Sequence, residues 1–176
     1  MTPLPARYAW LATEHAPRML VEGIKTLGTV ETPGARSNPI ILGWAREVGL
    51  DRAYSADSTP WCGLWMALVA KRAGKPLPRR PLWALDWALW GQDGGQPELG
   101  DVLVFVRPGG GHVGLYLGED AIAYHVLGGN QGDAVSIRRL AKERLHACRQ
   151  LYAVAKPANV RPIILESNGA LSADEG

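Results

Sequence analysis

Two short segments of the chain bring together the residue types of a cysteine hydrolase. The first is Thr59-Pro60-Trp61-Cys62-Gly63, and the second, Gly111-His112-Val113-Gly114, follows fifty residues later. A thiol in the first turn of a helix that faces an imidazole on a neighbouring strand is how a histidine base activates a cysteine nucleophile. These residue types in this order therefore predict an enzyme.

The residues before Cys62 have the pattern of a helix start. Thr59 is a favourable N-cap and Pro60 suits the first helical position, so Cys62 is predicted to be the third helical residue. There its sulfur would lie among unpaired backbone N–H groups at the positive end of the helix dipole, which lowers the pKa of a thiol. The alternative, a buried cysteine that acts as a small hydrophobic residue, stays open from the sequence alone.

His112 opens a segment with the alternation of a β-strand. His112, Gly114 and Tyr116 share one face of this strand, and the aliphatic residues between them share the other. A glycine beside the histidine on the same face leaves room for a close approach to a helix N-terminus. The alternative is a histidine that caps a hairpin.

A third polar group is needed to hold the imidazole in the right tautomer. The candidate is Asn130, in Gly128-Gly129-Asn130-Gln131-Gly132 at the end of the next predicted strand. Its amide oxygen would accept the ring N–H, with Gln131 and Glu119 as substitutes. Asn-Gln between glycines is also ordinary turn chemistry, which is the competing interpretation.

Three residues are the candidates for substrate contact: Trp61, Tyr54 and Gln131. Tyr54 would act with the backbone N–H of Cys62 as a donor to the oxyanion. No metal site is predicted, because Cys62 and the histidines at 112 and 125 match no compact ligand spacing. The mechanism needs no metal or organic cofactor.

The order of the predicted elements indicates an α+β fold, with N-terminal helices and the nucleophile helix packed on a small antiparallel sheet. Helices are expected at residues 17–28, 38–49 and 59–74, with a helical turn at 8–13 and a helical face of three tryptophans at 83–90. Strands are expected at residues 101–106, 112–117, 121–127, 134–138 and 151–155.

Length, charge and cysteine content narrow the class of protein. One domain is the expectation for 176 residues. A net charge of +2 does not indicate nucleic-acid binding. Two cysteines form no disulfide framework in a domain of this size. The first residues lack the apolar core of a signal peptide, and no apolar run is long enough for stable membrane insertion. We expect synthesis in the cytoplasm without a signal peptide.

Taken together, these segments resemble the CHAP and NlpC-type papain-like cysteine amidases and peptidases, a family of phage-associated and bacterial cell-wall hydrolases. The matching phrases are Glu31-Thr32-Pro33-Gly34, Ser37-Asn38-Pro39-Ile40, Thr59-Pro60-Trp61-Cys62, Gly100-Asp101-Val102-Leu103-Val104-Phe105, Gly111-His112-Val113-Gly114 and Leu127-Gly128-Gly129-Asn130-Gln131. In this order they cover residues 17–155, nearly the whole chain.

The resemblance implies a papain-like catalytic domain at residues 17–155, preceded by an extension at 1–16 and followed by a partly disordered tail at 156–176. It implies Cys62 as nucleophile, His112 as base and Asn130 as the polar third residue. Many CHAP relatives carry a glutamate two residues before that asparagine, where this chain has Gly128. The implied substrate is peptidoglycan, cleaved at an amide bond of the stem peptide or at its junction with the sugar.

We therefore expect a cysteine-dependent peptidoglycan amidase or endopeptidase, of the endolysin or phage-tail type, that acts at the cell wall or periplasm after export or lysis. One alternative is an interbacterial amidase effector with the same chemistry. A phage-type hydrolase implies a holin as partner. An interbacterial effector implies a secretion apparatus and an immunity protein. The alternative of another class is a non-catalytic wall-binding or virion structural protein on a hydrolase scaffold.

Overall fold

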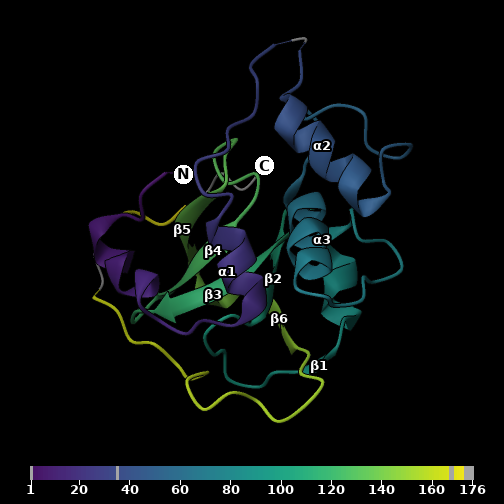
Figure 1. Cartoon of the computed structure of the whole chain (residues 1–176). Helices are drawn as coiled ribbons and strands as arrows, with labels where there is room; N and C mark the ends of the chain where they lie inside the picture. The colour runs from purple at the N-terminus through teal and green to yellow at the C-terminus, as the bar shows by residue number, and fades with distance from the viewer. Residues whose placement is uncertain (1, 35, 167–168, 173–176) are drawn as a thin grey trace.

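The structure, a computed structural model, describes residues 2–34, 36–166 and 169–172 and has a mixed α+β fold, as the sequence predicts. Helices α1 and α3 lie against one face of an antiparallel sheet, and α2 packs on α3 (Figure 1). The described helices are η1 (Ala6–Ala12), α1 (Arg18–Ile24), α2 (Pro39–Val48), α3 (Cys62–Arg72), η2 (Ala84–Leu89) and η3 (Lys142–Arg144), of which the three labelled η are 3₁₀ helices.

The sheet of the described residues has six strands in the order β1-β6-β2-β3-β4-β5, and every neighbouring pair is antiparallel. The strands are β1 (Gln92–Asp93), β2 (Val102–Arg107), β3 (Gly110–Glu119), β4 (Ala123–Gly128), β5 (Ser136–Ala141) and β6 (Leu145–Gln150). Strands β2 to β5 form a meander of consecutive neighbours. The last strand, β6, returns to pair with β2 on its other side.

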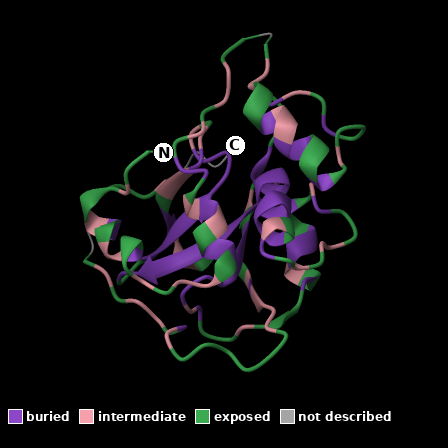
Figure 2. Cartoon of the chain, in the orientation of Figure 1, coloured by how far each residue is buried: buried purple, intermediate pink, exposed green. Residues whose placement is uncertain are grey.

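Side-chain alternation along the strands divides the core into two faces. Val113, Leu115 and Leu117 of β3 pack into the same cluster as the helices, as predicted from their spacing. Tyr116 belongs to a second cluster on the opposite face, together with Phe105 of β2. Helix α3 is buried along most of its length, so it forms the centre of the helical layer (Figure 2).

Local sequence signals explain where the helices begin and end. The side chain of Asn38 caps α2, because its Oδ1 accepts a hydrogen bond from the Ile40 N–H at 2.8 Å. Gly49 ends α2 in the left-handed conformation, with φ of 78°. Helix α3 begins at Cys62, two residues later than predicted, and its N-cap is Trp61 rather than Thr59. Cys62 is therefore the first residue of its helix, not the third.

The last predicted strand is wrong. Residues 151–155 form no strand, and the strand that completes the sheet is β6, at Leu145–Gln150. Only one residue of β6, Cys148, is buried. Because the segment lacks a run of alternating apolar residues, its sequence carries little strand signal. Its place in the sheet comes from pairing with β2 and β1.

Described residues near both termini pack against the rest of the domain. Tyr8 and Leu11 of η1 are buried in the core. Beyond β6, Ile164 forms a parallel bridge with Glu119, and the Ser172 N–H donates to the Arg139 carbonyl at 2.8 Å. These described parts of the predicted tail lie on the sheet, and residues 167–168 and 173–176 lie outside the described residues.

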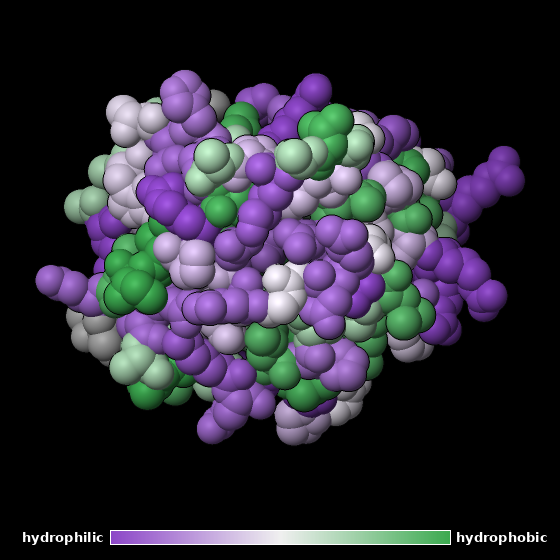
Figure 3. Space-filling view, turned by 90° about the horizontal axis from the view of Figure 1, so that it is seen from below, coloured by the Kyte–Doolittle hydropathy of each residue, from purple (hydrophilic) through white to green (hydrophobic). Residues whose placement is uncertain are grey.

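The outer surface carries no large apolar face on the side seen in Figure 3. Hydrophobic residues there form small separate groups among hydrophilic ones. In the part of the chain that the structure describes, no helix has the length and apolar character needed to cross a membrane.

Candidate active site

Cys62 lies at the N-terminus of α3 and is 4% exposed. Its sulfur is within hydrogen-bond reach of the backbone N–H of Gly63 and of its own N–H. A third donor comes from the sheet, because the N–H of Val113 in β3 also points to this sulfur. The thiol therefore lies beside the strand backbone directly after His112.

The pKa of the Cys62 thiol is raised above its usual value, contrary to the sequence-based expectation. Burial is the largest cause, since it removes water from a charge that the thiolate would carry. The surrounding N–H groups and the positive charge of Arg107 lower the pKa, but they do not outweigh burial. At neutral pH the resting cysteine is a neutral thiol.

Gly63 lets a loop cross the first turn of α3. A Cβ atom on Gly63 would lie 2.4 Å from the carbonyl oxygen of Leu82 and 2.6 Å from that of Pro81. The loop is fixed in place because the indole N–H of Trp87 donates to the Pro81 oxygen at 2.9 Å. Any larger residue at position 63 would push this loop away from the thiol.

His112 is fully buried, and its ring is held by Gln131. The His112 Nε2 lies 3.1 Å from Gln131 Oε1. The Gln131 Nε2 donates to the carbonyl oxygens of Val126 at 3.2 Å and Ser136 at 2.6 Å. Because these carbonyls can only accept, the amide oxygen must face the imidazole, which then carries its proton on Nε2. Nδ1 is the basic nitrogen of this tautomer.

Asn130, the predicted third residue, does not make this contact. It adopts the left-handed conformation, with φ of 57°, and its buried Oδ1 has no hydrogen-bond partner among the described residues. The turn is closed by the Gln131 N–H, which donates to the Ala134 carbonyl at 2.9 Å. This geometry turns the side chain of the next residue toward the histidine, so Gln131, the substitute candidate, orients the ring.

The two other predicted substrate contacts have structural partners. Trp61 is fully buried, and its indole N–H donates to Glu31 Oε2 at 3.2 Å, so it lies in the core and not in a binding surface. Tyr54 is 2% exposed, and its hydroxyl donates to the Thr59 carbonyl at 3.2 Å. Tyr54 thus borders the site, but its proton is committed to the backbone.

Asp57, which organises the segment before α2, has no motif signal of its own in the sequence. Its carboxylate Oδ2 accepts the backbone N–H groups of Thr32 at 3.0 Å and Asn38 at 2.7 Å. Asp57 is 2% exposed. Together with the Glu31–Trp61 contact, these bonds tie Thr32 and Asn38 to residues that come shortly before α3. The sequence hint of this contact was the pair of matching phrases at 31–34 and 37–40, which contain the residues that Asp57 binds.

A groove of about 480 Å³ opens beside Cys62. Its wall is mainly apolar, and Trp83, which is 64% exposed, belongs to it. Trp87 and Trp90 are core residues, so the predicted tryptophan face splits between core and groove. His112 does not line the groove. The lining residues are Ala53, Tyr54, Thr59, Pro60, Cys62, Leu82, Trp83, Ala84, Leu85, Arg107 and Gly109–Gly111.

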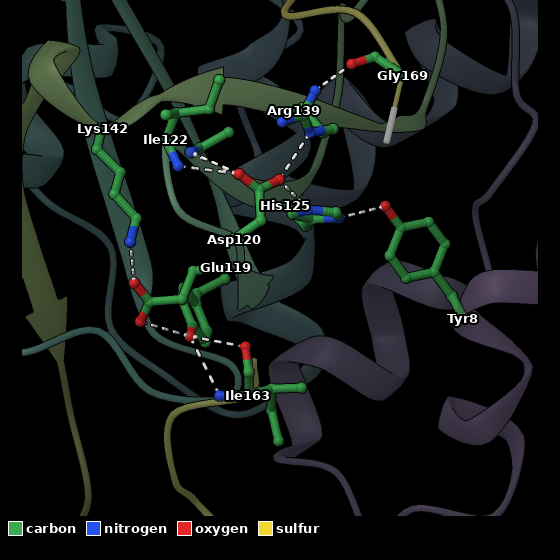
Figure 4. A network of polar contacts seen from close by, with 11 residues as sticks. Tyr8, Glu119, Asp120, Ile122, His125, Arg139, Lys142, Ile163 and Gly169 are labelled. Atoms are coloured by element: carbon green, nitrogen blue, oxygen red, sulfur yellow. Dashed lines mark hydrogen bonds and ion pairs between the residues drawn. The ribbon is translucent and has the colours of Figure 1, made fainter. Parts of the chain in front are cut away.

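His125 belongs to a different polar cluster, which Figure 4 shows at the ends of β3 and β4. Its Nε2 lies 2.9 Å from Asp120 Oδ2, and its Nδ1 lies 2.7 Å from the hydroxyl of Tyr8. Arg139 Nε donates to the same carboxylate oxygen at 2.7 Å and holds the pKa of Asp120 well below its usual range. Burial lowers the pKa of His125. This cluster joins η1 to the sheet.

The described residues offer no metal-binding group of three or more His, Cys, Asp or Glu side chains. Both cysteines are free thiols. No family model, no curated protein and no solved structure matches this chain.

Proposed function

We propose that this protein is a cysteine-dependent peptidoglycan hydrolase, an amidase or endopeptidase with a papain-like arrangement of its site. One observation carries the proposal. Cys62 opens a helix packed on an antiparallel sheet, borders a groove, and lies beside the strand of a histidine whose tautomer Gln131 fixes. Thiol, imidazole and amide are the three groups that this chemistry requires.

In the proposed mechanism, His112 Nδ1 takes the thiol proton as Cys62 Sγ attacks the amide carbon. The backbone N–H of Cys62 would stabilise the oxyanion at the start of α3. Imidazolium then protonates the leaving amine, which breaks the C–N bond and leaves a thioester. Water, deprotonated by His112, hydrolyses the thioester and restores the thiol. Gln131 Oε1 stabilises the imidazolium in both steps.

The raised pKa of Cys62 indicates which form of this mechanism applies. A resting thiolate–imidazolium pair is disfavoured, because burial opposes charge on the sulfur. The proton would move to His112 only as the sulfur attacks, so His112 acts as a general base. An active enzyme of this kind need not react fast with a thiol alkylator, because its resting cysteine is not a thiolate. Cleavage of the substrate is therefore the decisive measurement.

Peptidoglycan as the substrate rests on the sequence resemblance to cell-wall hydrolases. The groove is compatible with it. A mainly apolar groove with an exposed indole can hold a peptide or the face of a sugar ring.

The test is digestion of purified peptidoglycan, with the fragments identified by mass spectrometry. We expect wild type to release specific fragments, and Cys62→Ala to lose at least about 10⁴-fold in rate. Cys148→Ala is the matched control, because this second buried free cysteine lies on β6, on the opposite face of the sheet. It should retain activity. The fragments would also identify the bond.

Burial of the thiol favours one competing function, a wall-binding protein in which Cys62 is a core residue. Intact peptidoglycan after incubation with folded wild type, across several wall chemotypes, would reject the hydrolase. Co-sedimentation with the same walls would then support the binding function.

A further inference from the structure

An arginine with no counter-ion among the described residues lines the groove beside Cys62. Arg107 is the last residue of β2, and its Nε is buried without a hydrogen-bond partner among the described residues. No ion pair or hydrogen bond joins its guanidinium to another described residue. Two other arginines differ in this respect, since Arg80 and Arg139 each bind an aspartate at 2.7 Å.

A buried guanidinium N–H without an acceptor is costly, because it has lost its water without gaining a partner. The acceptor that best fits the planar fork of an arginine is a carboxylate, which it binds through two parallel hydrogen bonds. Leu82, Ala84 and Leu85 line the same groove, and such apolar surroundings strengthen the attraction between opposite charges. The groove is therefore complementary to an apolar or sugar-bearing ligand with one negative charge.

We propose that Arg107 binds a carboxylate of the peptide substrate, within a residue or two of the cleaved amide. The protein would then select acidic peptides over those whose carboxylates are amidated. The position of this carboxylate relative to the cleaved bond rests on the proposed function. The charge preference itself is a property of the groove and can be measured by binding alone.

Two kinds of peptide carboxylate could bind Arg107: the free α-carboxylate of a glutamyl residue within the peptide, or the C-terminal carboxylate. Three soluble disaccharide-peptides separate them. The first has a free glutamyl α-carboxylate and a free C-terminus, the second has only the glutamyl group amidated, and the third has only the C-terminus amidated.

The first experiment measures binding of each peptide to Cys62→Ala by isothermal titration calorimetry. We expect one of the two amidated peptides to bind about 10- to 100-fold more weakly than the unamidated peptide, the range of a charge-assisted hydrogen-bonded pair. The group amidated in that peptide is the one that Arg107 binds. Adding Arg107→Gln should remove that difference, and Arg107→Lys should keep part of it. Arg138→Gln, an exposed arginine on β5, is the matched control and should change nothing. Equal affinities for all three peptides, no binding, or a difference that survives Arg107→Gln would overturn the proposal.

The second experiment compares kcat/KM for the same peptides in the Cys62-containing protein. Arg107 also acts on the thiol, so its loss changes the cleavage of every peptide. The ratio between acidic and amidated peptides isolates the carboxylate contact, and it should fall toward one in Arg107→Gln. Cleavage without discrimination would reject the carboxylate site and keep the hydrolase. If the protein discriminated between the peptides in binding but cleaved none of them, the carboxylate site would stand and the hydrolase would be rejected.

Discussion

The His112–Gln131 contact determines which ring nitrogen can act as a base. Two carbonyl oxygens fix the orientation of the Gln131 amide, and the amide in turn fixes the tautomer of the imidazole. An acceptor at Nε2 also stabilises the protonated ring. Gln131 is therefore a positioning residue for His112, with an effect that should be visible in the pH dependence of the reaction.

Gln131→Leu should lower kcat by about 10- to 100-fold with little change in KM, an effect comparable to the loss of other groups that orient a histidine. Without the acceptor, the imidazolium loses stabilisation, so the pKa of His112 falls and the acid limb of the pH–rate profile moves to lower pH.

Asn130→Gly is the control for this prediction. Glycine accepts the left-handed conformation of position 130 without strain, and the Asn130 Oδ1 has no hydrogen-bond partner among the described residues. Its activity and pH profile should match wild type. A large loss in Asn130→Gly together with none in Gln131→Leu would return the role to the residue that the sequence favoured.

At the scale of elements, the start of α3 depends on the loop that crosses it. Gly63→Ala would bring its Cβ against the Leu82 carbonyl, so we expect a loss of about 1–3 kcal/mol in the free energy of unfolding and reduced cleavage. Gly43→Ala is the matched substitution, because a Cβ in the interior of α2 would meet only Arg46 at 3.8 Å. That variant should gain up to about 1 kcal/mol. Urea unfolding and peptidoglycan digestion measure both. Equal stability of the two variants would contradict the close approach at Gly63.

Sequence patterns predicted the elements with strong local signals, and missed those formed by pairing. Asn38 and Gly49 bracket α2 as expected, because capping is local chemistry. Strand β6 was missed, because its place depends on partners 40 to 47 residues earlier in the chain. Local cues also misplaced the N-cap of α3. Thr59 has a side chain suited to capping, but the helix begins after Trp61, and the Thr59 carbonyl accepts a hydrogen bond from the Tyr54 hydroxyl.

The candidate site shows the same limit. The sequence identified Cys62 and His112 as candidates and included Gln131 among its substitutes. It favoured Asn130 over Gln131, because the turn conformation that brings Gln131 to the ring is not readable from the sequence. It also predicted the wrong direction for the thiol pKa, since the helix N-terminus is a local feature and burial is a tertiary one.

At the scale of the whole molecule, a buried carboxyl makes stability depend on pH. Asp101 is 1% exposed, and burial raises its pKa to about 6. Asp101 ionises at lower pH in the unfolded chain than in the folded one. Its contribution to the free energy of unfolding is therefore fully present below pH 4 and is lost as pH rises through about 6. The loss at neutral pH is about 3 kcal/mol of unfolding free energy.

Asp101→Asn should remove that loss, because an amide can still accept the Glu98 N–H that Asp101 Oδ2 accepts at 3.0 Å. Relative to wild type, the variant should gain stability steadily between pH 4 and pH 6.5, as measured by urea unfolding at each pH. A constant difference across this range would show that Asp101 does not titrate there.

The two thiols of the chain report on folding as well as chemistry. Cys62 and Cys148 are both buried, and burial raises the pKa of each, so neither presents a thiolate to solvent at neutral pH. In the unfolded chain both return to ordinary reactivity. A brief pulse of a thiol-labelling reagent at neutral pH would therefore mark only molecules in which at least one of these thiols is not yet buried. Mass spectrometry of the labelled population would count them, with Cys62 recording closure of the helical layer and Cys148 recording arrival of the last strand.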